Sequence, residues 1–400
     1  MHNDINPIPI NELERLISLS ELDLDLTNLE NNFTDLTILA AKIAGTEMSV
    51  VNIIDSFTQW SIASHGIGVG QVPREESVCQ YTLLSEHPFE VPDFTLDERF
   101  NTKDFVTGPL GLRYYYGLPL QIIPGVNIGS LCLVDTQVKT LTPEKIELLV
   151  IVAETVIKRL KSYHALQLLQ DKLKESDELR KKVAHDIRGP LAGIIGLSEL
   201  MAEDDIANDP EQLMEYIGMI NKSGKSLLDL ADEILSESSK LTLSENELNL
   251  TEFKNKLDKL YTPQALVKNV ILEVVVDSAN TEIPFSRSKL LQIAGNLISN
   301  AIKFTPKLGK VQVRLSLKMI ENQKVLYIEV ADNGIGIDAI AVENIISRQS
   351  ETTKGTMGEK GYGFGLSLVS HLVESLNGKL TVKSEPGKGT SFEVILPQNL

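Results

Sequence analysis

The segment Lys182-Val-Ala-His-Asp-Ile-Arg-Gly-Pro-Leu191 lies near the middle of the 400-residue chain, inside a long stretch with helical spacing of its apolar residues. An imidazole at His185 is followed by a carboxylate at Asp186, a guanidinium at Arg188 and a helix-bending proline at Pro190. A lone histidine on a helix is more often a surface or core residue than a functional one. Whether His185 is functional must therefore be inferred from the sequence on either side of this segment.

Downstream, the chain predicts a second long helix. The acidic segment 203–209 ends the first helix, and Asp209, Pro210 and Glu211 then supply an N-cap, a first-position proline and a first-turn acid. Steps of four and three then join Leu213, Ile217, Ile220, Gly224, Leu227, Ala231, Ile234, Ser238 and Leu241. Two such helices form an antiparallel hairpin, and two hairpins from two chains form a four-helix bundle. We therefore expect a dimeric helical domain over residues 179–245.

Upstream, residues 146–173 have the spacing of a coiled coil. The first series of apolar residues is Ile146, Leu149, Ala153, Val156, Leu160 and Tyr163. The pattern restarts out of phase at Leu166, Leu169 and Leu173, after a step of three where four is due. This run is either an exposed connector helix or a dimeric signalling helix that passes a rotation or change of register to His185. The second interpretation is favoured because the seam runs straight into the His185 segment.

Three short sequence motifs, called words below, lie near the C-terminus and predict a phosphate-binding site. In the first, a helical run, Asn296 and Asn300 share one face and Lys303 lies close by. Carboxamide oxygens suit Mg²⁺, and lysine suits phosphate. The second word, Asp332–Ile337, follows a predicted strand, and the third, Gly361–Leu366, opens a helix whose N-terminus favours an anion. One glycine-rich word alone is weak evidence, but the three in this order are jointly specific.

These motifs resemble those of a known family. The His185 segment resembles the H-D/E-x-R-x-P phospho-acceptor box of sensor histidine kinases. The three words resemble the N box and two glycine boxes of the GHKL ATPases, which include histidine kinases, DNA gyrase, MutL and heat-shock chaperones. The resemblance implies that His185, Asp186 and Arg188 are catalytic. It implies nucleotide binding by Asn296, Asn300, Lys303, Phe304, Asp332, Gly334, Gly336, Thr353, Gly361, Gly363, Gly365 and Leu366.

The same resemblance implies individual roles at the nucleotide. Asn296 and Asn300 would hold Mg²⁺, Lys303 would contact phosphate, and Asp332 would accept a hydrogen bond from the adenine amino group of ATP. The segment 338–360 would form a lid over the nucleotide, although it lacks the phenylalanine pair usual in the family.

The residues around His185 indicate how it would be phosphorylated. A neutral imidazole nitrogen of His185 would attack the γ-phosphorus of ATP in line. Asp186 could accept the other ring N–H and so fix the tautomer. Pro190 predicts a bend just beyond the acceptor. Related kinases that also dephosphorylate their partner usually carry Thr or Asn at the position of Gly189. Gly189 either lacks the side chain that would orient a water or leaves space for the lid or the regulator to approach, and both interpretations predict weak phosphatase activity.

The first 163 residues mix helices and short strands. We expect helices at 29–44 and 78–84, and strands at 48–55, 60–63, 89–91, 118–123 and 128–134. The words SVCQYTL, VPDFTLDERF, GLRYYYGLPL, IGSLCLVD and LTPEKIELL resemble a bacterial GAF domain over residues 21–163. The resemblance implies a sensory module with a ligand pocket over an antiparallel sheet. Cys79 is followed by Gln80 rather than the histidine usual beside a bilin cysteine, so we expect a buried structural cysteine and no covalent bilin.

Composition excludes several other classes. The formal charge of −17 argues against nucleic acid or an anionic membrane as a general partner. The two cysteines, Cys79 and Cys132, have no metal-binding spacing and fit a reducing cytoplasm. No signal peptide and no run of 18 apolar residues is seen, so we expect a cytoplasmic protein without a transmembrane segment.

The sequence thus predicts a multidomain α+β protein. It has an N-terminal α/β sensor, a helical connector with a hairpin that forms a dimeric four-helix bundle, and a C-terminal α/β sandwich of the GHKL type. The expected divisions are a lead segment 1–20, GAF domain 21–163, connector 164–178, phosphotransfer domain 179–245 and catalytic domain 246–400.

The predicted function is that of a homodimeric histidine kinase that uses Mg-ATP and passes phosphate from His185 to an aspartate of a separate response regulator. Two alternatives are a GHKL ATPase of the chaperone or topoisomerase kind and a non-catalytic signalling scaffold. The sequence does not reveal the GAF ligand or signal, the cognate regulator, or whether phosphorylation occurs in cis or in trans.

Overall fold

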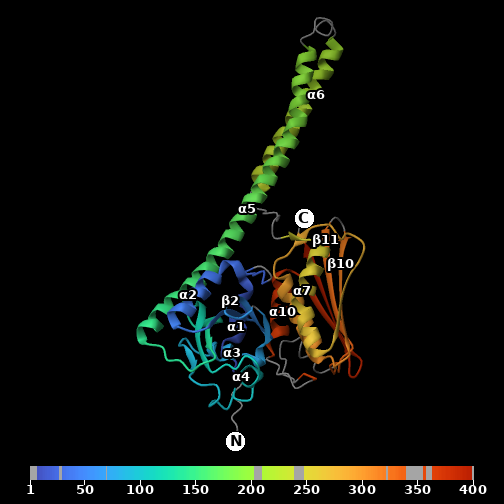
Figure 1. Ribbon diagram of the computed structural model, residues 1–400. Helices are drawn as coiled ribbons and strands as arrows, with labels where there is room; N and C mark the ends of the chain where they lie inside the picture. Colours follow the sequence, from blue (N-terminus) through green and yellow to red (C-terminus); the bar gives the residue numbers. More distant parts are fainter. Residues whose placement is uncertain are drawn as a thin grey trace. The chain divides into compact units, whose positions relative to one another are not determined.

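The structure is a computed structural model that describes residues 7–26, 29–68, 70–201, 210–237, 247–320, 323–338, 355–356 and 363–398. It divides into two compact units (Figure 1). One unit comprises Met1–Ala165 together with Leu248–Gln398, and the other comprises Leu166–Glu247 with the last two residues. The first unit contains a six-stranded sheet and a five-stranded sheet, β7 (Glu247–Leu248) pairs with β9 (Phe285–Ser286) in a small two-stranded sheet, and the second unit is a helical hairpin.

The N-terminal sheet has six antiparallel strands in the order β3-β2-β1-β6-β5-β4. Its strands are β1 Met48–Ile54, β2 Thr58–His65, β3 Gln71–Pro73, β4 Phe89–Val91, β5 Tyr114–Ile123 and β6 Val126–Asp135. Side chains alternate between its two faces. Leu131 and Leu133 of β6 join the core beneath helices α2 and α5, whereas Cys132 and Val134 join a second core on the opposite face. The predicted strands are therefore confirmed, with β5 starting four residues early.

The helices of this domain are α1 Glu12–Glu21, α2 Thr34–Ala44, α3 Cys79–Thr82 and α4 Asp104–Thr107, with 3₁₀ turns at Glu30–Asn32 and Arg74–Glu76. Gly45 ends α2 in the left-handed conformation at φ 76°, as predicted. The helix predicted to begin at Leu29 begins instead at Thr34, because a 3₁₀ turn takes up the residues before it.

Helix α1 was not predicted from the sequence, which gave residues 1–20 no defined element. It is anchored by a buried ion cluster in which Glu12 accepts hydrogen bonds from Arg15 (2.8 Å) and Arg74 (2.5 Å). Burial raises the pKa of Glu12, but the two guanidinium groups outweigh it and lower that pKa overall. The third partner, Arg74, lies far along the chain, so local periodicity could not reveal this anchor.

The long helix α5 spans Pro143–Met201, and its first part corrects the coiled-coil prediction for the residues up to Leu160. Leu149, Ala153, Val156 and Leu160 are buried in the core of the N-terminal domain itself. The seam through Leu160 is therefore the face by which α5 covers its own sheet, and it is not a dimer contact. Farther along, Leu166, Leu169 and Leu173 are exposed.

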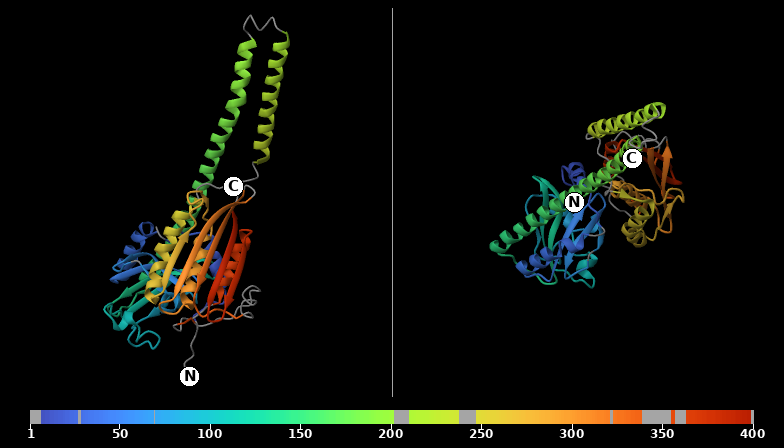
Figure 2. Two further views of the ribbon diagram at one scale, coloured as in Figure 1. Left: turned by 90° about the vertical axis from the view of Figure 1, so that its right-hand side faces the viewer. Right: turned by 90° about the horizontal axis from the view of Figure 1, so that it is seen from above.

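The helical hairpin consists of the later part of α5 and α6 Pro210–Glu237. The two helices lie side by side and antiparallel (Figure 2), as predicted. Pro210 is the first residue of α6, also as predicted, and α5 continues through Pro190 without interruption. None of the helices within the described ranges combines the length and the apolar character that crossing a membrane requires.

The C-terminal domain is a sheet covered by helices. Its elements are β7 Glu247–Leu248, α7 Leu250–Lys268, β8 Ile271–Val276, β9 Phe285–Ser286, α8 Leu290–Phe304, β10 Lys310–Ile320, β11 Gln323–Asp332, α10 Phe364–Ser375, β12 Lys379–Glu385 and β13 Gly389–Gln398. The main sheet has the order β12-β13-β11-β10-β8, with only β8 and β10 parallel among these pairs. Alternate residues of β10 are buried beneath α7 and α8, which makes an α/β sandwich.

Helix α7 is another element that the sequence did not predict. It is capped at its C-terminus by Asn269, which adopts the left-handed conformation at φ 57°. Asparagine tolerates this conformation better than most residues. Strand β8 therefore begins two residues later, at Ile271.

Candidate nucleotide-binding site

Helix α8 carries a polar face in an otherwise apolar environment. Asn296, Asn300 and Lys303 are each less than 10% exposed, although the rest of the helix packs into the core of the C-terminal domain. The amide nitrogen Nδ2 of Asn296 donates to the carbonyl of Gln292 at 2.8 Å. Its Oδ1 is buried and has no hydrogen-bond partner in the described part of the chain. A buried acceptor without a partner is costly, so a bound group that satisfies Oδ1 would be favoured here.

This orphaned oxygen fits the predicted metal site. Mg²⁺ prefers oxygen ligands and takes them from a few protein side chains together with substrate phosphates. The Oδ1 atom of Asn296 is an oxygen of the kind that could bind Mg²⁺, and Asn300 lies one turn along the same helix.

The end of α8 anchors neighbouring segments. The ammonium of Lys268 on α7 donates to the carbonyl of Lys303. Thr356 donates through its backbone N–H to the same carbonyl at 3.3 Å and through its hydroxyl to the carbonyl of Thr305 at 3.0 Å. The Lys303 ammonium lies 4.9 Å from the ring centroid of Phe304. Lys303 and Phe304 therefore lie where one part of the predicted lid segment, Thr356, meets the helix.

Asp332 ends strand β11 and is held by backbone donors. Its Oδ1 accepts hydrogen bonds from the N–H groups of Gly334 (2.8 Å) and Thr390 (3.3 Å). Burial raises the pKa of Asp332, and these two hydrogen bonds oppose the rise. Its other oxygen, Oδ2, has no hydrogen-bond partner among the residues that the structure describes. The carboxyl group is thus oriented by one oxygen and retains the other for a donor such as an amino group.

Gly334 and Gly336 are required for close packing of the backbone. A Cβ at Gly334 would lie 2.3 Å from the carbonyl oxygen of Phe304, and a Cβ at Gly336 would lie 2.1 Å from that of Glu385. Gly336 also has a φ of 69°, which side-chain-bearing residues rarely adopt. These glycines therefore allow the Asp332 loop to pack between the end of α8 and the turn between β12 and β13. This packing shapes one side of the site.

The third glycine-rich word adjoins the first. Gly363 caps the N-terminus of α10 at φ 79°, and Gly365 follows in the first turn, ahead of Leu366. A Cβ at Gly365 would lie 3.1 Å from Asn296 Oδ1. The start of α10 therefore faces the polar side of α8, and a helix N-terminus favours an anion at this point. The predicted residues Thr353 and Gly361, and most of the predicted lid, lie outside the described residues.

The N-terminal domain contacts this same face within the larger compact unit. A Cβ at Gly365 would lie 2.7 Å from the ring of Phe57. Phe57 is presented by a turn in which Asp55 Oδ1 accepts from the N–H groups of Phe57 (2.8 Å) and Thr58 (2.7 Å). Thr58 and Ser299 of α8 are both hydrogen-bonded to Gln264, each at 3.1 Å. Sequence reasoning missed this contact, since nothing local distinguishes Phe57 from a core aromatic residue.

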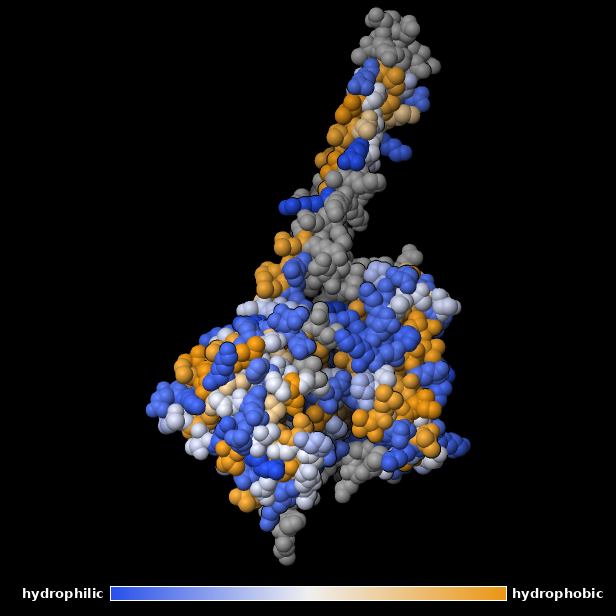
Figure 3. All heavy atoms as spheres, in the orientation of Figure 1, coloured by the Kyte–Doolittle hydropathy of each residue, from blue (hydrophilic) through white to orange (hydrophobic). Residues whose placement is uncertain are grey.

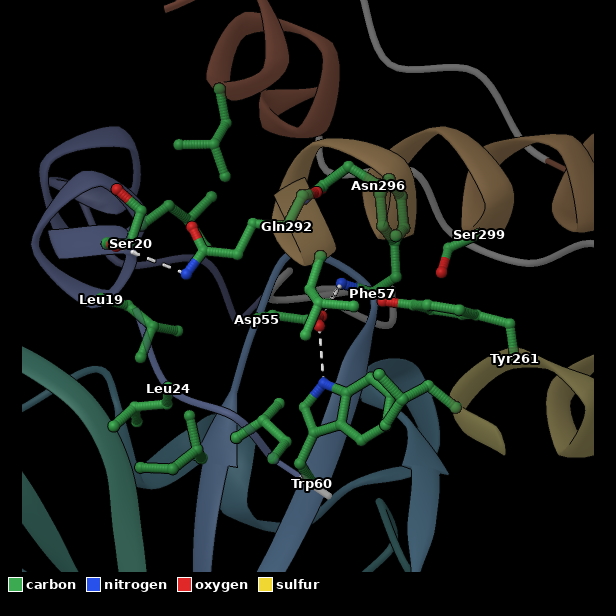
Figure 4. A pocket seen from close by; sticks show the side chains of 17 residues that line it. Leu19, Ser20, Leu24, Asp55, Phe57, Trp60, Tyr261, Gln292, Asn296 and Ser299 are labelled. Atoms are coloured by element: carbon green, nitrogen blue, oxygen red, sulfur yellow. Dashed lines mark hydrogen bonds between the residues drawn. The ribbon is translucent and has the colours of Figure 1, made fainter. Parts of the chain in front are cut away.

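A cavity of about 60 Å³ lies beside this contact (Figure 4). Trp60 and Tyr261 form part of its wall, with their rings edge to face at 6.0 Å. The indole N–H of Trp60 donates to Asp55 at 2.6 Å, and Gln292 donates to the carbonyl of Ser20 at 3.4 Å. These contacts join α1 and the Asp55 turn to α7 and α8.

The predicted acceptor segment lies on α5 in the hairpin. The backbone at His185, Asp186 and Arg188 is helical, and the residues Arg188 and Gly189 are exposed. The side chains of His185 and Asp186 lie outside what the structure describes, so the proposed hydrogen bond between them stays a prediction. A Cβ built at Gly189 meets no described atom within 4 Å.

Two family models match separate parts of the chain. Residues 175–241 match the His Kinase A (phospho-acceptor) domain, and residues 286–400 match the histidine kinase-, DNA gyrase B- and HSP90-like ATPase. The first match contains His185, and the second contains every nucleotide-site residue described above on α8, β11 and α10. A phospho-acceptor match together with a match to this ATPase supports ATP-dependent histidine kinase activity.

Curated relatives agree with this class. The chain is 36% identical over 234 residues to the autoinducer 2 sensor kinase/phosphatase LuxQ of Vibrio cholerae, which covers 56% of this chain and 26% of that protein. It is 32% identical over 239 residues to the cell-division control histidine kinase PdhS of Brucella suis, which covers 56% and 23% respectively. The matched region thus spans about a quarter of the length of these relatives.

Solved structures share the class by name but superpose poorly. The catalytic domain of histidine kinase ThkA is 24% identical, covers 38% of this chain and 94% of its own, and has a TM-score of 0.32. A complex of ThkA with the response regulator protein TrrA is 21% identical, covers 78% and 79%, and has a TM-score of 0.31. At these TM-scores the superpositions contribute nothing to the functional assignment.

Proposed function

We propose that this protein is an ATP-dependent protein-histidine kinase that phosphorylates its own His185 and then transfers the phosphoryl group to an aspartate of a separate response regulator. The observation that carries the proposal is the orphaned Asn296 oxygen beside the start of α10, in the same ATPase-type domain as the oriented Asp332 carboxyl. The same chain carries a phospho-acceptor match around His185.

Each group has a chemical role in this proposal. Asp332 Oδ2 accepts from the adenine amino group, and Lys303 and the N-terminus of α10 bind phosphate. Asn296 and Asn300 hold Mg²⁺, which offsets negative charge on the transferring phosphoryl group. A neutral His185 nitrogen attacks the γ-phosphorus, the bond between that phosphorus and the β,γ-bridging oxygen breaks, ADP leaves, and Asp186 holds the other ring N–H. Little covalent work is left to the protein beyond positioning and charge stabilisation.

We infer a homodimer built from the helical hairpin. Large apolar side chains remain exposed on both helices, among them Leu191 and Ile195 on α5 and Met214, Ile217 and Leu228 on α6. Hydrophobic residues are visible along the helical hairpin in Figure 3. A second hairpin would cover such residues in a four-helix bundle, which is the arrangement that supports the proposal.

The N-terminal domain is proposed to be a GAF sensory domain that controls the kinase through Phe57. Its antiparallel sheet with α2 and α5 on one face supports the assignment, and Tyr114, Tyr115 and Tyr116 are buried on strand β5 of that sheet. With Phe57 against Gly365, an apolar ring occupies the approach to the α10 N-terminus. Nucleotide phosphate and Phe57 would then compete, so a signal that withdraws the ring would activate the kinase.

This control is tested with Phe57→Ala in the full-length protein. The variant should lower the KM for ATP in autophosphorylation several-fold, because no ring opposes the phosphates. Leu96→Ala is the control, since Leu96 is a similarly apolar side chain of the same domain but is 80% exposed. An unchanged KM in Phe57→Ala would reject this mode of control and leave the kinase assignment standing.

The kinase assignment itself is tested by incubation with γ-labelled ATP. A phosphohistidine is labile in acid and stable in base, so label with that behaviour is expected on the protein. A chaperone- or topoisomerase-type ATPase would release phosphate without retaining label, and a non-catalytic scaffold would do neither. We also propose a cytoplasmic location, which the charge and cysteine usage support.

A further inference from the structure

Two free cysteines meet inside the N-terminal domain, on the face of the sheet away from α2 and α5. Cys79 begins α3 and Cys132 lies on β6, and both are buried without being bonded to each other. Their Sγ atoms are 2.9 Å apart. The chain has no other cysteine, so the fold has brought its only two thiols into contact from positions 53 residues apart.

Polar groups converge on this pair. The amide nitrogen of Asn52 lies 3.3 Å from Cys79 Sγ and 3.5 Å from Cys132 Sγ. The hydroxyl groups of Tyr115 and Ser130 lie 3.2 Å and 3.0 Å from Cys132 Sγ. Asn52 is itself oriented, because its Oδ1 accepts from another side chain of the sheet at 2.8 Å. The two sulfurs therefore sit in a buried network of hydrogen-bond donors.

Packing alone does not account for this arrangement. A buried cysteine that only fills space behaves as a small apolar residue and needs no donors. A neutral thiol is a weak acceptor, so donors buried against it gain little, whereas a thiolate accepts strongly. The network thus suits a site at which one sulfur carries negative charge.

The two thiols are also electrostatically distinct. Burial raises the pKa of Cys79, but hydrogen bonds from Cys132, Ser130 and Tyr115 outweigh it and lower that pKa to about 7. Burial, together with the neighbouring Cys79, raises the pKa of Cys132. We assign Cys79 as the nucleophilic member of the pair because its pKa is the lowered one and because it lies on the four-residue helix α3, whereas Cys132 is held within strand β6.

Access to the pair is through a weak element of the fold. Helix α3, which carries Cys79, has only four residues. Short elements open locally at a lower free energy than the whole domain unfolds. A small oxidant can thus reach Cys79 without loss of the sheet that holds Cys132.

We propose that Cys79 and Cys132 form a redox-modification site at which a hydroperoxide converts the dithiol into an intramolecular disulfide. The Cys79 thiolate attacks one peroxide oxygen, the O–O bond breaks, and the leaving alkoxide takes a proton from water, which leaves a sulfenic acid on Cys79. The Cys132 sulfur then attacks the Cys79 sulfur, the S–O bond breaks, and water departs with the Cys132 proton. The dithiol loses two electrons, and the hydroperoxide is reduced to an alcohol and water.

The test uses the reduced full-length protein, treated with one equivalent of hydrogen peroxide, quenched with N-ethylmaleimide and digested without reductant. Mass spectrometry should show a peptide that links Cys79 to Cys132 within one chain, lost on treatment with dithiothreitol. Cys132→Ser should stop at a Cys79 sulfenic acid that dimedone traps, and Cys79→Ser should leave Cys132 reduced. Alkylation of both thiols in the peroxide-treated wild-type protein, or links only between chains, would overturn the proposal.

The network supplies a graded control. Tyr115→Phe removes one hydroxyl donor and keeps the ring, and should slow disulfide formation severalfold at neutral pH. Tyr114→Phe makes the same change at the neighbouring residue, whose hydroxyl bonds to Glu90 and not to either sulfur, and should leave the rate unchanged. Equal rates in both variants would contradict the role assigned to the donors.

Discussion

Asp332→Asn separates the role of Asp332 in the fold from its role in binding. In the structure Oδ1 accepts from the N–H groups of Gly334 and Thr390. An asparagine oxygen can accept both hydrogen bonds, so the loop should keep its conformation. The amide NH₂ then replaces Oδ2, so that one hydrogen-bond donor would face another, the amino group of adenine.

The expected loss follows from the lost contact. A hydrogen bond to a charged group contributes about 1.5–3 kcal/mol. Its removal should therefore weaken ATP binding roughly 10- to 150-fold. Because burial raises the pKa of Asp332 in the free protein, ATP affinity of the wild type should also fall as pH drops, starting at a higher pH than for an ordinary aspartate. The variant should lack this pH dependence.

The assay is calorimetric titration of the full-length protein with a non-hydrolysable ATP analogue, with thermal unfolding measured alongside. Glu329→Gln is the matched control, since it changes a carboxylate to an amide on the same strand and leaves the Asp332 loop untouched. If Asp332→Asn bound the analogue within twofold of wild type, the adenine role would be refuted. A lowered melting temperature in that variant alone would show instead that the loop depends on the charge.

Three further predictions concern other residues. Gly336→Ala should lower the free energy of unfolding by more than the about 1–3 kcal/mol that left-handed strain alone costs, because the new Cβ would also clash with Glu385. Gly387→Ala is the control, since Gly387 has a similar φ of 78° but open space around it and should show the strain only. Equal melting temperatures of the two variants would contradict this prediction. Asn300→Asp places a carboxylate beside the triphosphate and should abolish autophosphorylation. A near-normal rate would mean that this face of α8 has a packing role only. Gly189→Thr should raise dephosphorylation of the phosphorylated regulator and spare autophosphorylation, because the described chain leaves space for the new side chain; fast kinase-dependent decay with the wild type would contradict the role given to the missing side chain.

The arrangement of the candidate nucleotide site could be predicted where its determinants are local. Asn296 and Asn300 share a face through helix periodicity alone, and Asp332 with its glycines follows a strand whose alternation is clear. What the sequence did not reveal was why Gly334 and Gly336 are glycines. They pack against the backbone of Phe304 and Glu385, which are distant in sequence.

The failures have a common physical origin. Steps of three and four between Ile146 and Leu160 are produced by any helix with one buried face, whether the partner is a second chain or its own sheet. The structure shows that the partner is the sheet. Helix α1 likewise depends on a buried Arg74, and the Phe57 contact depends on tertiary packing, so neither leaves a local signal.

The most direct test of the central claim is the chemical nature and location of the phosphoryl group. Full-length wild type, His185→Gln and His164→Gln are incubated with γ-labelled Mg-ATP, and His164 serves as the control because it lies on the same helix, α5. Wild type and His164→Gln should acquire equal label that is acid-labile and base-stable, and His185→Gln should acquire none while still binding ATP. Label at the wild-type level on His185→Gln, or acid-stable label on any of the three, would contradict the assignment of His185 as the acceptor.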